Sequence, residues 1–159
     1  MFSRLLSLSL LASLVACDEK EPASDSGVDF GYDCTEIGCT DGLQGEFQPE
    51  LKTQGTYVFT LDLDGAVSTC SLTLPIVDSE SCTGALQITR SGSALADSEH
   101  SLPSFRIDEI GFTSYTLTAE LDGTELFSVT EEPDWELVHP NGEECGPTCE
   151  IASTTVAVP

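Results

Sequence analysis

Hydrophobic and polar residues alternate in several stretches of the chain, with the two-residue period of β-strands that bury one face. The period is clearest over residues 57–63 (YVFTLDL) and recurs over 115–121 (YTLTAEL). Each run is followed by an Asp-Gly pair and then by another alternating run, over 66–74 and 124–129. Because both residues of a tight hairpin turn must tolerate positive φ, as Asp-Gly does, the pattern predicts two β-hairpins.

Weaker runs predict further strands at residues 43–47, 85–89, 104–107 and 151–158. Pro103 is expected to mark the start of the third of these. Beyond residue 16, no window sustains the apolar period of a helix. About seven or eight short strands indicate an all-β protein, either an antiparallel β-sandwich of immunoglobulin-like type or a barrel. The connections around Pro75 and Pro133 are long for a simple meander, which favours the sandwich.

The first sixteen residues follow a different pattern. Arg4 precedes an apolar run from Leu5 to Leu14 that is interrupted by serines and is too short to span a bilayer stably. This pattern predicts a secretory signal peptide over residues 1–16. The segment Leu14-Val15-Ala16-Cys17 resembles the lipobox of bacterial lipoproteins, and the resemblance implies that Cys17 is lipidated, for example with palmitate, and becomes the mature N-terminus. The alternative is ordinary signal cleavage nearby, with Cys17 as a spare thiol.

Residues 17–31 are acidic, rich in Pro, Ser and Gly, and poor in large apolar side chains. Such a segment buries too little surface to offset its ordering entropy, so it predicts a disordered, flexible tether with a reach of roughly 20 Å. The β-sandwich domain is then expected over residues 32–159.

The charge of the chain is strongly negative. It has 5 Lys and Arg against 28 Asp and Glu, a formal net charge of −23. Cleavage after residue 16 removes only Arg4 and leaves 4 basic and 28 acidic side chains, or −24. This excess repels phosphates, so we expect no nucleic-acid binding. Solubility at high density on a membrane explains the charge more simply than a specific cationic partner does.

Six of the seven cysteines remain if Cys17 carries a lipid, and an even number in an exported chain predicts disulfides. The six are Cys34, Cys39, Cys70, Cys82, Cys145 and Cys149. Cys70 and Cys82 lie near the ends of consecutive predicted strands and are expected to pair. The other four allow either two local bridges or two crossed bridges between the ends of the domain. A redox site at Cys145-Gly-Pro-Thr-Cys149 is disfavoured, because three residues separate the cysteines and a strand follows.

The sequence offers few candidates for catalysis, and we expect no catalytic residues and no enzyme activity. There is no G-x-S-x-G motif, and Ser91-Gly92-Ser93 is only superficially similar. His100 lies in a polar turn and is expected to hydrogen-bond to loop backbone, and His139 is expected to be an ordinary loop residue. A hydrolase remains an alternative, and it would require His100 beside an acid and an exposed serine.

We predict no metal and no cofactor. Two histidines with bridged cysteines leave no zinc ligand set. Calcium takes carboxylate oxygens, and Asp62 and Asp64 at a predicted strand end are the candidates, with further acids over 131–136 and 143–144. None of these matches a twelve-residue calcium loop, so solvation is the expected role of the acids. A glycosidase would use two such carboxylates, but one Trp and three Tyr give no aromatic platform for a sugar.

Turn and cysteine motifs carry a wider resemblance over most of residues 39–152. They include Cys39-Thr40-Asp41-Gly42-Leu43, Thr69 to Pro75, Arg90 to Leu95, His100 to Pro103, and Pro140 to Cys149. This set resembles uncharacterised exported lipoproteins of Gram-negative bacteria. The resemblance implies a small β-sandwich with disulfides and assigns no functional residues.

We therefore expect a lipid-anchored lipoprotein of the cell envelope, with its domain in the periplasm or at the cell surface. It would act as a binding or structural module whose partner is an unknown envelope protein or glycan. A calcium-stabilised adhesin-like domain is the alternative from another class. Asp18 resembles the inner-membrane retention signal of enteric lipoproteins, but the rule varies among lineages and leaves the outer membrane open.

Overall fold

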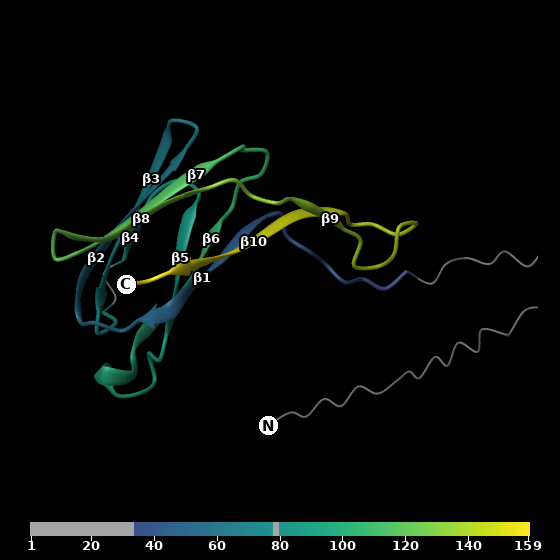
Figure 1. Ribbon diagram of the computed structural model, residues 1–159. Coiled ribbons are helices and arrows are strands. Elements are labelled where there is room, and N and C mark those ends of the chain that lie inside the picture. Colours follow the sequence, from purple (N-terminus) through teal and green to yellow (C-terminus); the bar gives the residue numbers. More distant parts are fainter. Residues whose placement is uncertain (1–33, 78–79) are drawn as a thin grey trace, which may run out of the picture. The chain divides into compact units, whose positions relative to one another are not determined.

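The computed structural model describes residues 34–77 and 80–159, which form two five-stranded β-sheets packed as a sandwich (Figure 1). The strands are β1 (Gly42–Leu51), β2 (Gly55–Leu63), β3 (Ala66–Leu74), β4 (Ser81–Cys82), β5 (Leu86–Ser91), β6 (Ser101–Ile107), β7 (Tyr115–Leu121), β8 (Thr124–Glu131), β9 (Glu136–Val138) and β10 (Cys149–Ala157). A short 3-10 turn, η1 (Asp97–Glu99), precedes β6. The described part of the chain contains no helix with the length and apolarity needed to cross a membrane. The predicted signal peptide (1–16), the lipidation of Cys17 and the predicted tether (17–31) lie outside the described residues.

One sheet is wholly antiparallel and has the strand order β4-β3-β2-β7-β8. Both predicted hairpins are confirmed in it, since β2 pairs with β3 and β7 with β8. Asp64 and Gly65 have φ angles of 49° and 95°, and Asp122 and Gly123 have 50° and 78°. All four turn residues therefore take the left-handed conformation for which Asp-Gly is suited.

The other sheet is mixed and has the order β5-β6-β1-β10-β9. Strands β1 and β10 are parallel in it, with a register that runs from Gly42 opposite Ile151 to Gln48 opposite Ala157. The expectation of a purely antiparallel sandwich is therefore wrong for this sheet. The alternating pattern predicts which face of a strand is buried but not its direction, and no hairpin turn constrains two strands from opposite ends of a domain.

The structure also has ten strands where about seven or eight were expected. The two unpredicted strands, β4 and β9, contain two and three residues, which is too short for an alternating pattern to show. Strand β6 begins at Ser101, so Pro103 lies inside it and not at its start. The ladders on both sides of β6 are irregular near this point, and a residue without an N–H fits an interrupted ladder.

The core lies between the two sheets and confirms the predicted buried faces. Tyr57, Phe59 and Leu61 of β2 are fully buried. Phe47 of β1 is the centre of an aromatic cluster, with its ring centroid 5.7 Å from Phe59 of the opposite sheet. The rings of Phe105 and Phe127 lie at 5.3 and 5.9 Å from that of Phe47, so all four rings contribute to one continuous core.

Candidate functional site

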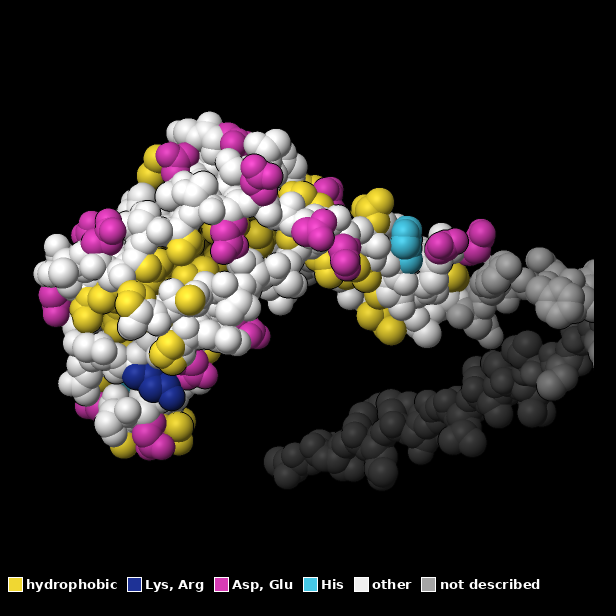
Figure 2. All heavy atoms as spheres, viewed as in Figure 1, with side chains coloured by type: hydrophobic (Ala, Val, Ile, Leu, Met, Phe, Trp, Pro, Cys, Tyr) yellow, Lys and Arg dark blue, Asp and Glu magenta, His cyan; other side chains and the backbone are white. Residues whose placement is uncertain are grey.

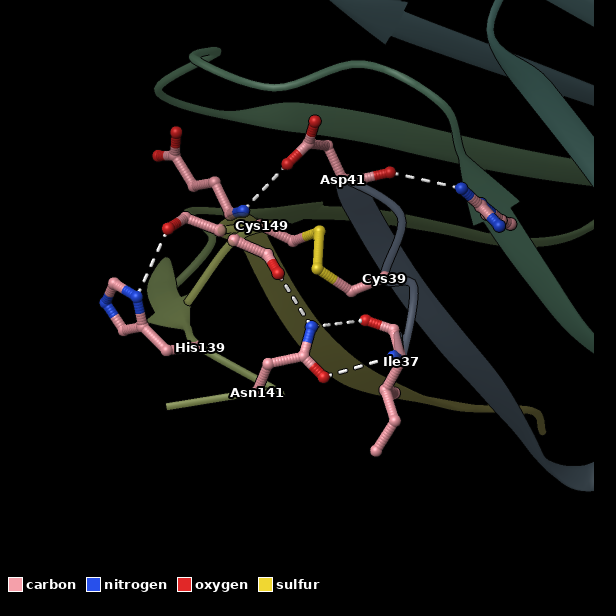
Figure 3. Close-up of a disulfide and its surroundings, with 10 residues drawn as sticks. Ile37, Cys39, Asp41, His139, Asn141 and Cys149 are labelled. Atoms are coloured by element: carbon pink, nitrogen blue, oxygen red, sulfur yellow. Dashed lines mark hydrogen bonds between the residues drawn. A yellow bond between two sulfur atoms is a disulfide. The ribbon is translucent and has the colours of Figure 1, made fainter. Parts of the chain in front are cut away.

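Two disulfides join the first described residues to the segment before β10 and to the first residue of β10. They are Cys34–Cys145 and Cys39–Cys149, and Figure 3 shows the second. The crossed alternative is thus correct, and the local pairings of these four cysteines are wrong. The parallel pairing of β1 with β10 gives the reason, because Gly42 lies opposite Ile151 and so brings the residues just before Gly42 close to those just before Ile151. We call residues 34–41 and 139–150, with both bridges, the terminal clamp.

Asn141 holds the first segment of the terminal clamp in place through its side-chain amide (Figure 3). Its Oδ1 accepts hydrogen bonds from the Thr35 hydroxyl at 2.5 Å and from the Ile37 N–H at 3.0 Å. Its Nδ2 donates to the carbonyls of Ile37 at 2.9 Å and Gly146 at 2.7 Å. These four bonds use both donors and both acceptor positions of a primary amide. Within the described residues the first segment of the terminal clamp pairs with no strand, and Asn141 supplies hydrogen bonds of the kind that a neighbouring strand would supply.

Asp41 connects the terminal clamp to the mixed sheet. Its Oδ1 accepts a hydrogen bond from the Glu150 N–H at 2.8 Å, and its carbonyl accepts one from the Arg106 guanidinium at 3.1 Å. Sequence reasoning identified the four cysteines but missed Asp41 and Asn141. Each of these two residues precedes a glycine, and such an Asp-Gly or Asn-Gly pair indicates only a turn.

The third disulfide, Cys70–Cys82, joins β3 to β4 and confirms the predicted pair. With Glu80, these two cysteines form the one group of three potential metal ligands that residues 34–77 and 80–159 bring within 4.8 Å. Both sulfurs are bonded to each other and supply no thiolate, and Glu80 forms an ion pair with Arg90 at 2.8 Å. This group therefore serves as a staple at the edge of the sheet.

The two calcium candidates take part in turn structure. Asp62 accepts a hydrogen bond from the Gly65 N–H at 2.7 Å, which closes the β2–β3 turn. Asp64 accepts two longer bonds from the N–H and hydroxyl of Thr113, each at 3.4 Å. The carboxylates thus have different protein partners, and in the described residues neither belongs to a group of three potential ligands.

The two histidines lie in different surroundings. His100 is buried, and its Nδ1 accepts a hydrogen bond from the Ile76 N–H at 2.9 Å, which confirms the predicted bond to loop backbone. His139 is exposed, and its Nδ1 lies 3.2 Å from the Thr148 hydroxyl. Among the hydrogen bonds and ion pairs of the described residues, neither ring contacts a carboxylate. The arrangement that a hydrolase would require around His100 is therefore not formed in this part of the chain.

A hollow of about 550 Å³ lies on the outer face of the mixed sheet. Its polar side chains come from β1, β5, β6 and β10 and include Gln44, Glu46, Thr89, Ser104, Arg106 and Ser153. Arg106 is bonded to Asp108 and to the Asp41 carbonyl, so its guanidinium is already engaged. The hollow offers hydroxyl, amide and carboxylate groups, which can form hydrogen bonds to a polar ligand.

Hydroxyl groups on the outer face of the antiparallel sheet behave differently. They pair with one another across strands, as Thr116 does with Thr130 at 2.8 Å and Thr118 with Ser128 at 3.0 Å. In the described residues no such bond joins Thr89 to Ser104, although these residues lie opposite each other in the mixed sheet. The hydroxyls of Thr89 and Ser104 are thus not paired with each other, while those of Thr116, Thr118, Ser128 and Thr130 are paired across strands of the other sheet.

Comparison of the chain with protein-family models, with curated proteins and with solved structures finds no match. What the structure establishes is a small two-sheet β domain with three disulfides. The likeness to exported lipoproteins remains a prediction from the sequence motifs.

Proposed function

We propose that this chain is a lipid-anchored lipoprotein of the bacterial cell envelope, which holds a binding or structural domain outside the cytoplasm. The observation that carries the proposal is the terminal clamp with its two crossed disulfides. Three disulfides in one small domain are typical of an oxidising compartment, because cytosolic thiols are kept reduced. An export signal that ends at a lipid-modified Cys17 is consistent with that location.

The position of the terminal clamp suits a domain that is tethered by its N-terminus. A pull on the residues before Cys34 reaches Cys145 and Cys149 through two covalent bridges. From there it is distributed to β1 and β10, which pair with each other over seven residues of the mixed sheet. The load therefore does not fall on the hydrogen bonds of a single terminal strand, which would fray first.

Binding is the other half of the proposal. The hollow on the mixed sheet supplies polar groups from four neighbouring strands, which suits a glycan or a polar protein surface of the envelope. An envelope partner in the periplasm or at the cell surface would bind the domain within the distance from the membrane that the tether allows.

The anchor and the compartment are tested together by expressing the precursor in a Gram-negative host with a clickable palmitate analogue. We expect label in the native chain and none in Cys17→Ser, while a matched Cys70→Ser/Cys82→Ser variant keeps its label. Intact mass with and without reductant is expected to show three reducible bonds. A mature chain that carries no lipid, or six free thiols in the native protein, would overturn the proposal.

A further inference from the structure

On one side of the sandwich, each sheet has a strand with backbone N–H and C=O groups that pair with no further strand of the described residues. Strand β8 (eight residues) is the last strand of the antiparallel sheet, and among the described residues it pairs with β7 alone. In the mixed sheet, β9 covers β10 only from Cys149 to Ile151, and within the described residues no strand follows on that side for the rest of β10. The two edges are close together, because the Thr154 hydroxyl of β10 donates a hydrogen bond to the carboxylate of Glu131 of β8.

An apolar band lies between these two edges. Leu126 and Val129 belong to β8 and Val158 follows β10, and all three are only partly buried and pack against the core. Figure 2 shows a continuous yellow surface at this place, between the positions that β8 and β10 have in Figure 1. Residues 34–77 and 80–159 thus leave the core incompletely covered on this side, where they also leave the outer N–H and C=O groups of β8 without a neighbouring strand.

Acidic side chains border the apolar band. Glu125 is exposed at the beginning of β8, Glu131 ends the strand and Glu132 follows it. Figure 2 shows acidic groups around the yellow surface. The three basic side chains of the described residues pair with other acids: Lys52 with Glu50, Arg90 with Glu80 and Arg106 with Asp108. The negative charge beside β8 therefore has no basic counterpart within the described part of the domain.

We infer that β8 is a strand-addition site for an extended segment of a partner polypeptide, which alternates apolar with polar residues and carries Lys or Arg near its ends. Its backbone hydrogen-bonds to β8, its apolar side chains cover the band, and its cations meet Glu125 and Glu132. A second copy of this chain is a poorer occupant, because it brings the same acids and a net charge of −23. The inference rests on the binding half of the proposed function and names for it a second surface, distinct from the hollow on the mixed sheet.

The test uses the whole mature chain, with Cys17→Ser to keep it soluble, and a nine-residue peptide that alternates valine with threonine and has a lysine at each end. We expect titration to give saturable binding, and NMR to show shifts and slower hydrogen exchange at the β8 amides. A peptide with glutamates in place of the lysines is expected to bind about tenfold more weakly. A peptide with a central proline lacks one backbone donor and is expected to bind little.

Charge reversal at the edge gives a matched pair of variants. Glu125→Lys is expected to weaken binding of the lysine peptide about fivefold and to strengthen binding of the glutamate peptide. Glu109→Lys makes the same change in net charge at an exposed position between β6 and β7, and its affinities should equal those of the native chain. Both sites are exposed, so the fold is expected to persist, which far-UV circular dichroism checks.

Four results would overturn the inference. They are no binding up to about 1 mM peptide, shifts confined to the hollow of the mixed sheet, equal affinities for the two charged peptides, and dimerisation through β8 in analytical ultracentrifugation. The chain in this test carries no lipid, so failure here leaves the anchor proposal intact. Equally, a native Cys17 without lipid would leave peptide binding at β8 unaffected.

Discussion

The hydroxyl of Tyr115 donates a hydrogen bond to the carboxylate of Glu131, with 2.9 Å between the two oxygens. The same carboxylate accepts a hydrogen bond from Thr154, so one acid connects β7 and β8 of the antiparallel sheet to β10 of the mixed sheet. Tyr115 itself is buried. Its burial raises the pKa of the phenol above the ordinary value of 10.0, and the adjacent Glu131 raises this pKa further.

This contact predicts a specific loss of stability in alkali. The folded state keeps the Tyr115 proton at a pH where the unfolded state releases it, so the stabilisation is complete below about pH 10 and is lost as the pH rises beyond that. Tyr115→Phe should lower the free energy of unfolding by about 1 kcal/mol at neutral pH, because one hydrogen bond is removed. Above pH 10 the free energy should fall less steeply for the variant than for the native chain.

Urea unfolding, followed by the fluorescence of Trp135, the one tryptophan of the chain, measures both effects. The indole lies half-buried and donates a hydrogen bond to the Phe112 carbonyl at 3.3 Å, so it reports on the folded packing. Parallel pH profiles for the native chain and Tyr115→Phe would contradict the assignment of the alkaline loss to this phenol.

The two bridges of the terminal clamp should act non-additively on stability. Each closes a loop of about 110 residues when it stands alone, but the second bridge to form closes only the short segments between the cysteines. The chain-entropy account then gives about 3 kcal/mol for loss of either bridge and about 7 kcal/mol for loss of both. The double loss approaches the whole stability of an ordinary domain.

Serine pairs test this prediction: Cys34→Ser/Cys145→Ser, Cys39→Ser/Cys149→Ser, and all four together. Cys70→Ser/Cys82→Ser is the control, since its bridge closes a separation of only 12 residues and shortens the long clamp loops, within which it lies, only slightly. Its loss should therefore add to that of either clamp bridge. If the fourfold variant lost no more free energy than the sum of its two halves, the clamp bridges would be independent.

The strands that sequence reasoning predicted best are those whose pattern is local. Tyr57, Phe59 and Leu61 alternate with polar residues, and an Asp-Gly turn follows them, so both the buried face and the partner strand were predictable. Strand β10 was predictable as a strand but not as the parallel neighbour of β1, because no local turn joins the two. The same non-local pairing decides the connectivity of the crossed disulfides, which the sequence left open.

The candidate sites were less predictable for a related reason. Asn141 carries four hydrogen bonds to residues that lie mostly about a hundred positions away, and a sequence window around it shows only a turn. The hollow on the mixed sheet combines four strands, and the open edge of β8 depends on the strand order of the whole sheet. Such features follow from topology and have no signature in the spacing of residues.

His100 should contribute to stability through its bond to the Ile76 N–H. Nδ1 is the acceptor of this bond, and the other ring nitrogen, Nε2, is buried without a hydrogen-bond partner among the described residues. His100→Ala would leave a part-buried backbone donor without its acceptor and should cost about 1 to 3 kcal/mol in urea unfolding. His139→Ala removes an exposed ring and should change the free energy by less than about 0.5 kcal/mol. Similar losses in the two variants would mean that the buried bond contributes nothing specific.

The two Asp-Gly turns should respond differently to alanine. Asp64 and Asp122 both have positive φ, so alanine at either position should cost about 1 kcal/mol in backbone strain. Asp122 Oδ1 also accepts a hydrogen bond from the Thr56 N–H at 2.9 Å, whereas the bonds of Asp64 are long. We therefore expect Asp122→Ala to lose about 2 kcal/mol in total, and Asp122→Asn, which keeps an acceptor and tolerates the turn, to stay near the native value. Equal losses for Asp64→Ala and Asp122→Ala would show that backbone conformation alone decides the cost at these turns.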